Sequence, residues 1–230
     1  PFTMLFRGCS TLLAYEAGVL VALKEMSPDI LKSASRIYGA SSGSLVATFG
    51  LCDCDVGKGC ALPFILYLKR SNVRMSFLHH LKHSFWMGLL GRKAIKILKE
   101  VLNKHLPTNA HQLVSGKLHV ILTRVHDWRS VTVSEFTSKE DLIEALVCSC
   151  FIPVYFGIFP PVYRGVRYVD GELAMWRANF ASPTTITVSG FSGEYDICPR
   201  DSSSAFFTFQ ISDWVLYVSK RNLYRLQFIF

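Results

Sequence analysis

The sequence predicts an α/β fold in which helices cover both faces of a mostly parallel central sheet. Two strand-like runs, at 3–6 and 36–38, are each followed by a glycine-led turn and a helical pattern, as in a doubly wound sheet. A third run, at 167–169, ends directly at Asp170-Gly171. The 230 residues are enough for one such domain with a sizeable core.

Strand and helix patterns alternate in the first fifty residues. Short apolar runs predict strands, whereas apolar residues spaced three or four apart predict helices, and Pro28 ends the first helix. The predicted order is a strand at 3–6, a helix at about 12–26, a helical connector at 29–34, a strand at 36–38 and a helix from the following turn to about 51.

The remainder of the chain begins with a loop at 53–59 and a helical, basic stretch at 62–106. Its lysine-rich face fits either a solvated surface or contact with a membrane surface. A capping box at 137–140 opens the next helix. The later predicted elements are strands at 118–122, 131–133, 167–169 and 184–189, a helix from the capping box through 148, and the start of a helix at 222–226.

The apolar run 151–161 is too short and too rich in proline to span a bilayer. It fits either a buried core segment or the wall of a lipid-binding mouth. No signal peptide and no transmembrane helix are predicted, and the chain is expected to be truncated at both ends.

The composition is that of an apolar globular protein, because 50% of the residues are hydrophobic and 18% are charged. The net charge of +8 suits an anionic surface such as a phospholipid monolayer. No zinc-finger spacing or RNA-binding motif supports a nucleic-acid partner. The seven cysteines form no Cys-x-x-Cys pair and predict reduced thiols, with no metal site.

The chemistry-bearing motif is Gly39-Ala40-Ser41-Ser42-Gly43, which lies between a strand and a helix. This is the nucleophile-elbow pattern, in which Gly39 and Gly43 permit a tight turn that presents the Ser41 hydroxyl. A serine hydroxyl needs a base to take its proton. The last of the seven histidines is His126, so no histidine follows Asp170 as the usual triad order would require.

The base predicted instead is Asp170, followed by Gly171 at the end of a strand. A carboxylate in an apolar pocket is a stronger base because burial disfavours its charged form. Alone, Asp170-Gly171 would fit an ordinary turn. The backbone N–H groups of Gly8, Cys9 and Ser10, just before a helix, are the predicted oxyanion hole.

These three motifs, in this order, resemble the patatin-like phospholipase family, in its adiponutrin and adipose triglyceride lipase subfamily. The similarity extends to Leu122-Thr123-Arg124-Val125, Val147 to Pro153, Tyr163 to Gly171 and Asp196-Ile197-Cys198-Pro199. The resemblance implies a three-layer patatin-like sandwich and a Ser41–Asp170 dyad without cofactor or metal. It also implies a patatin-like domain at 2–181, followed by a partial C-terminal extension at 182–230.

The family resemblance implies a lipid acyl hydrolase, above all a triacylglycerol lipase, at cytoplasmic lipid droplets and membranes, with a lipase co-activator protein as a further partner. Two alternatives stay open: a transacylase that makes acylceramide, favoured by the stretch Ser134 to Glu140, and an impaired lipid-droplet binding or regulatory protein. The second is favoured by departures from the family pattern. Ser10 replaces a glycine, Leu13 replaces a small residue, and Glu172 adds a carboxylate next to Asp170-Gly171.

Overall fold

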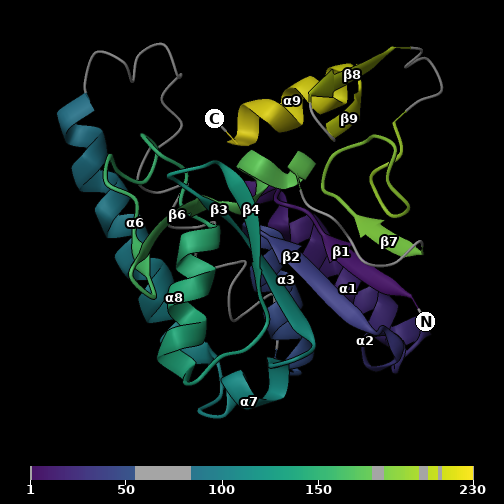
Figure 1. Cartoon of the computed structure of the whole chain (residues 1–230). Helices are drawn as coiled ribbons and strands as arrows, with labels where there is room; N and C mark the ends of the chain where they lie inside the picture. The colour runs from purple at the N-terminus through teal and green to yellow at the C-terminus, as the bar shows by residue number, and fades with distance from the viewer. Residues whose placement is uncertain (1, 55–83, 178–183, 202–206, 212–213, 230) are drawn as a thin grey trace.

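The computed structural model describes residues 2–54, 84–177, 184–201, 207–211 and 214–229 (Figure 1). Most of the predicted loop at 53–59 and the first part of the predicted basic helical stretch, 62–83, lie outside the described residues. Within the described residues, no helix is both long enough and apolar enough to cross a bilayer.

A mixed seven-stranded sheet with helices packed against it forms the centre of the fold and confirms the predicted α/β class (Figure 1). The parallel core consists of β7 (Thr185–Val188), β1 (Thr3–Phe6), β2 (Arg36–Ala40) and β3 (Leu118–Arg124). Three antiparallel strands complete the sheet: β4 (Arg129–Val133), β6 (Val166–Asp170) and β5 (Val162–Tyr163).

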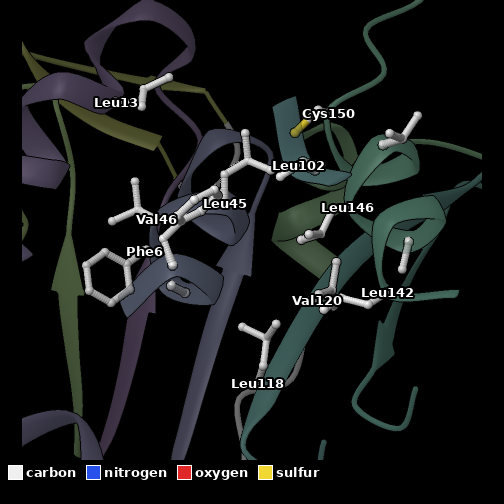
Figure 2. Packing of buried hydrophobic residues seen from close by; sticks show 14 of the residues in the cluster. Phe6, Leu13, Leu45, Val46, Leu102, Leu118, Val120, Leu142, Leu146 and Cys150 are labelled. Carbon is white, nitrogen blue, oxygen red and sulfur yellow. The ribbon is translucent and has the colours of Figure 1, made fainter. Parts of the chain in front are cut away.

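The parallel strands alternate between two apolar clusters because successive side chains point to opposite faces. One face joins the large core with α1 (Leu13–Met26), α3 (Ser42–Leu51), α6 (Ser84–His105), α7 (Ala110–Val114) and α8 (Lys139–Ser149). Figure 2 shows part of this core, including Phe6, Val46 and Leu118. The opposite face carries a small cluster of Leu5, Tyr38, Ala40, Ile121 and Met175, the last from the 3-10 helix η3 (Gly171–Arg177).

The register around β3 brings two strand ends together. Residues 120–121 of β3 pair with both β2 and β4, so these two strands lie on opposite edges of β3. Residues 122–124 pair with both β4 and β6, so β6 lies on the same edge as β2. Since β6 runs antiparallel to β3 and β2 runs parallel to it, the carboxyl ends of β2 and β6 meet there.

Most predicted elements are found within one or two residues, and α2 (Ile30–Ser33) confirms the helical connector. The predicted capping box is wrong by one residue. Ser138, not Thr137, is the N-cap of α8, and its hydroxyl accepts a hydrogen bond from the Asp141 N–H at 3.1 Å. The Asp141 carboxylate, not that of Glu140, reaches back to the N–H of Thr137 at 2.9 Å.

The C-terminal part contains elements with weak sequence patterns. The hairpin of β8 (Thr208–Ile211) and β9 (Trp214–Tyr217) is not predicted, whereas α9 (Lys220–Ile229) confirms the predicted helix start. Strand β7 lies within the predicted C-terminal extension, yet it pairs with β1 in the central sheet. The domain boundary at 181–182 therefore stays a prediction, and the sheet continues past it.

Candidate active site

Ser41 occupies a strained turn between β2 and α3. Its backbone has φ 52° and ψ −131°, a left-handed conformation that an L-residue adopts only where the surroundings enforce it. The surroundings are tight, because a Cβ on Gly39 would lie 2.5 Å from the Ser44 Cα and one on Gly43 would lie 2.3 Å from the Phe6 oxygen. The turn therefore has the geometry that the nucleophile-elbow pattern predicts.

Two hydroxyl groups hold the backbone of Ser41 in place. The Ser41 N–H donates to Ser149 Oγ at 2.9 Å, and the Ser149 hydroxyl donates onward to the Ile121 carbonyl at 2.8 Å. The Ser44 hydroxyl donates to the Ser41 carbonyl at 2.6 Å. These contacts link the elbow to α8 and β3, so the position of Ser41 depends on both.

Asp170 is the last residue of β6 and is 3% exposed. It pairs with Leu122 of β3, whereas Ala40, directly before Ser41, pairs with the adjacent Ile121 on the same edge. A Cβ on Gly171 would lie 2.2 Å from the Ile121 oxygen and 3.3 Å from the Ala40 Cβ. The predicted nucleophile and base thus converge although they are far apart in the sequence.

The two carboxyl oxygens of Asp170 have different surroundings. Oδ1 accepts a hydrogen bond from the Glu172 N–H at 2.9 Å. Oδ2 is buried and has no hydrogen-bond partner of ordinary geometry among the described residues. The backbone carbonyl of Asp170 accepts from the Thr123 hydroxyl at 2.7 Å, which fixes the end of β6 against β3.

Burial raises the pKa of Asp170 to about 7, because an ionised carboxylate is poorly solvated there. The Ser41 hydroxyl and the Glu172 N–H lower this pKa, and the negative charge of Glu172 raises it. The Ser41 hydroxyl therefore interacts with the Asp170 carboxyl, although no hydrogen bond of ordinary geometry closes the pair.

Two of the three predicted oxyanion donors are engaged within the protein. The Gly8 N–H donates to Glu172 Oε1 at 2.5 Å, and the Cys9 N–H donates to Ser42 Oγ at 2.9 Å. Ser10 begins the 3-10 helix η1 (Ser10–Leu12) at φ 50°, a conformation that favours glycine. This confirms that the glycine position expected there has special backbone geometry.

Glu172 also forms a buried ion pair with Arg7. Arg7 Nη2 lies 2.9 Å from Glu172 Oε2, and the two side chains are 5% and 9% exposed. A Cβ on Gly8 would lie 2.6 Å from the Glu172 Cγ and 2.8 Å from the Ser41 Cβ, so Glu172 is an immediate neighbour of the nucleophile. The sequence alone identified the charge of Glu172 but not its contact with Gly8 and Arg7.

Three functional neighbours were not predicted: Arg7, Ser42 and Ser149. The sequence marks them only by position: Arg7 precedes the oxyanion turn, Ser42 lies in the elbow motif and Ser149 lies in the stretch 147–153. Leu13, which replaces a small residue of the family pattern, is fully buried in the large core cluster. Within the described ranges, no group of three or more His, Cys, Asp or Glu side chains is placed to hold a metal ion.

The chain is similar to proteins of known kind along nearly its whole length. A family model described as "Patatin-like phospholipase" matches residues 4–177. The human "Patatin-like phospholipase domain-containing protein 2" is 42% identical over 221 residues, which cover 96% of this chain and 42% of that protein.

Two further relatives carry transferase names. The human "Omega-hydroxyceramide transacylase" is 38% identical over 226 residues, 98% of this chain and 41% of that protein. The mouse "1-acylglycerol-3-phosphate O-acyltransferase Pnpla3" is 38% identical over 222 residues, 96% of this chain and 51% of that protein. The chain thus spans about half, or less, of the length of these curated relatives.

Proposed function

The chain belongs to the patatin-like phospholipase family, and from this premise we propose that it is a lipid acyl hydrolase acting through Ser41 and Asp170. The observation that carries the proposal is the convergence of β2 and β6 on one edge of β3. Those two strands end at the elbow serine and at a buried carboxylate, a nucleophile next to a base.

The reaction proposed for this geometry is acyl transfer through an acyl-enzyme. Asp170 takes the proton of the Ser41 hydroxyl on Oδ2, the oxygen that has no other partner of ordinary geometry among the described residues. The Ser41 Oγ then bonds to the ester carbonyl carbon, and the alcohol leaves with the proton returned by Asp170. Water, activated in the same way, releases the fatty acid and restores both groups.

The raised pKa of Asp170 suits this role. A carboxyl with a pKa of about 7 is a stronger base than an exposed aspartate and is still largely ionised slightly above neutrality. Its Oδ1 is held by the Glu172 N–H, which fixes the orientation of Oδ2 toward the elbow. The base is therefore both positioned and tuned by residues of η3 and β6.

We propose triacylglycerol as the preferred ester and the surface of cytoplasmic lipid droplets or membranes as the place of action, with a lipase co-activator protein as a partner of the whole protein. Three exposed apolar residues of the run 151–161 support the lipid surface, since Val154, Ile158 and Phe159 are 56%, 62% and 71% exposed. Arg167 is exposed, lies nearby in sequence and adds positive charge, whereas the charge of Arg164 is paired with Asp141.

A transacylase is the second candidate, supported by the names of two relatives. It would use the same acyl-enzyme and replace water by a lipid alcohol, so the choice between them lies in the acceptor. A third candidate, an impaired lipid-binding protein, is supported by the Glu172 carboxylate on the Gly8 N–H, because one lost oxyanion donor costs about 10²–10³ in rate.

The test is labelling of the chain with a fluorophosphonate serine probe, beside Ser41→Ala and the elbow control Ser44→Ala. We expect labelling that Ser41→Ala abolishes and Ser44→Ala reduces without abolishing. Fatty acid release from emulsified triolein, with and without ω-hydroxyceramide as acceptor, then separates hydrolase from transacylase. If the native chain and Ser41→Ala are labelled equally, Ser41 is not the nucleophile.

A further inference from the structure

Glu172 binds a backbone N–H group, that of Gly8, which the sequence predicts to be an oxyanion donor. One carboxylate oxygen, Oε1, is 2.5 Å from the Gly8 nitrogen, and the other, Oε2, is 2.9 Å from Arg7 Nη2. Both oxygens are therefore held by donors, one of them a cation. The Glu172 Cγ and the Ser41 Cβ both lie next to the same point beside Gly8, so this anion is bound directly beside the nucleophile.

We propose that Arg7 and the Gly8 N–H form an anion-binding site for acyl groups beside Ser41, and that Glu172 is its built-in occupant. This inference rests on the proposed function and deepens it. The site takes the developing oxyanion of the ester or the carboxylate of a fatty acid, and Glu172 must leave before either can enter. Arg7 thereby joins Gly8 as an oxyanion donor.

The chemistry of the occupant supports the ligand class. A glutamate carboxylate has the same planar CO₂⁻ group as a fatty acid, and it is bound through one N–H and one guanidinium group. The tetrahedral oxyanion of acyl transfer needs donors of the same kind. A site that binds a carboxylate therefore has the donors to bind the tetrahedral oxyanion as well.

A third carboxylate, that of Glu16, is coupled electrostatically to both Arg7 and Glu172. Glu16, in the first turn of α1, is fully buried, and neither of its oxygens has a hydrogen-bond partner of ordinary geometry among the described residues. Burial raises the pKa of Glu16 and the Cys9 thiol lowers it, while the charge of Glu172 raises this pKa and that of Arg7 lowers it. The charge of Arg7 thus favours the ionised form of Glu16, whereas the charge of Glu172 disfavours it.

The central experiment measures the rate of fluorophosphonate labelling of Ser41 in Glu172→Ala. The probe forms a tetrahedral adduct whose oxygen needs the same donors as the ester oxyanion. We expect labelling at least about tenfold faster than in the native chain, since one oxyanion donor is worth 10²–10³ in rate. Glu172→Gln, which keeps an acceptor of the same size, should give a smaller increase, and the exposed Glu25→Ala should give none.

Glu172→Ala removes the carboxylate that pairs with the buried charge of Arg7 and could unfold the protein. The double variant Arg7→Ala/Glu172→Ala controls for this, because it removes both buried charges together. In this double variant the Gly8 N–H is free but Arg7 is absent. Its labelling rate should therefore be higher than that of the native chain and lower than that of Glu172→Ala. Circular dichroism shows which variants are folded. If the folded variants label at the native rate while Ser41→Ala abolishes labelling, the proposed function stands and the occupied anion site is overturned.

A second measurement does not depend on the reactivity of Ser41. Octanoate should raise the Tm of Glu172→Ala, and of Ser41→Ala/Glu172→Ala, by several degrees while leaving the native chain unchanged. Octanamide, which lacks the charge, should have no such effect. If octanoate stabilises neither variant, there is no anion site beside Gly8, whatever the fate of the serine probe.

Discussion

Asp170 and Ala40 face consecutive residues of β3, Leu122 and Ile121, from the same side. Because β2 and β6 run in opposite directions along this edge, the residues that follow their carboxyl ends are directed toward one another. The sheet itself, rather than a long loop, therefore sets the separation between Ser41 and the Asp170 carboxyl.

Activity should rise with pH through about 7. Asp170 acts only when ionised, and burial raises its pKa to about 7, so the rate should fall about tenfold per pH unit well below that value. The measurement is kcat/KM, or the labelling rate, from pH 5.5 to 9. The control is His119→Gln, because histidines also titrate near neutrality, and it should keep the inflection. A profile that is flat over this range would contradict the assignment of the base.

Asp170→Asn should abolish turnover and stabilise the fold at alkaline pH. The folded pKa of Asp170 lies above its unfolded value, so its stabilising contribution is full below pH 4 and is lost as the pH rises through about 7. The uncharged amide avoids this loss. The advantage of Asp170→Asn in the free energy of unfolding should therefore grow by about 2–3 kcal/mol between pH 5 and pH 8.

Urea denaturation at the two pH values checks this prediction. Asp196→Asn is the control, because the pKa of Asp196 is lowered by hydrogen bonds from Thr187 and the sign is therefore reversed. Its substitution should cost stability at pH 8. An Asp170→Asn variant that is less stable than the native chain at pH 8 would contradict the effect of burial on the carboxyl.

The sequence predicts the parts of this site that are local in the chain. The elbow at Ser41 follows from five adjacent residues, and Asp170 follows from the end of a strand. The end of a strand does not by itself place Asp170 at the elbow, because β6 is antiparallel to β3 and its end lies beside β2 only through the register. No local pattern encodes that register.

The contacts that the sequence did not predict are long-range side-chain contacts. The hydrogen bond from the Ser41 N–H to Ser149 spans 108 residues, and that from the Gly8 N–H to Glu172 spans 164 residues. Each joins a polar residue with many possible partners to a backbone group. Apolar periodicity therefore placed the helices and strands, whereas the hydrogen bonds between them required the folded structure.

Ser149→Ala should loosen the elbow. The substitution leaves the Ser41 N–H and the Ile121 carbonyl without their buried partner, which costs about 1–3 kcal/mol in the free energy of unfolding. Labelling of Ser41 should also slow, because its strained backbone loses a support. Ser130→Ala is the matched control, since the Ser130 hydroxyl has no hydrogen-bond partner among the described residues. Equal stability of the two variants would show that Ser149 does not hold the elbow.

Ser10→Gly should stabilise the fold. Ser10 has φ 50°, where a side chain is strained, and glycine removes that strain at the cost of a more flexible unfolded chain. The net gain expected is about 1 kcal/mol, measured by thermal or urea unfolding. Ser10→Ala keeps a Cβ and should give no gain. If glycine and alanine have the same effect, the backbone at Ser10 is not strained in solution.

Phe159→Asp should weaken binding to a lipid surface. Phe159 is 71% exposed, beside the exposed Ile158, and burial of one such ring in lipid is worth about 1.5–3 kcal/mol. Binding to phospholipid-coated triolein emulsions, measured by flotation, should therefore fall about tenfold or more. The control is Phe207→Asp, because Phe207 is 75% exposed but lies far along the chain, before β8. If both variants lose the same amount of binding, the effect comes from the change in net charge. If Phe159→Asp binds the emulsion as tightly as the native chain, Phe159 does not contact lipid.

Labelling with a soluble serine probe should be unchanged in Phe159→Asp, because the substitution alters access to an interface and leaves Ser41 and Asp170 in place.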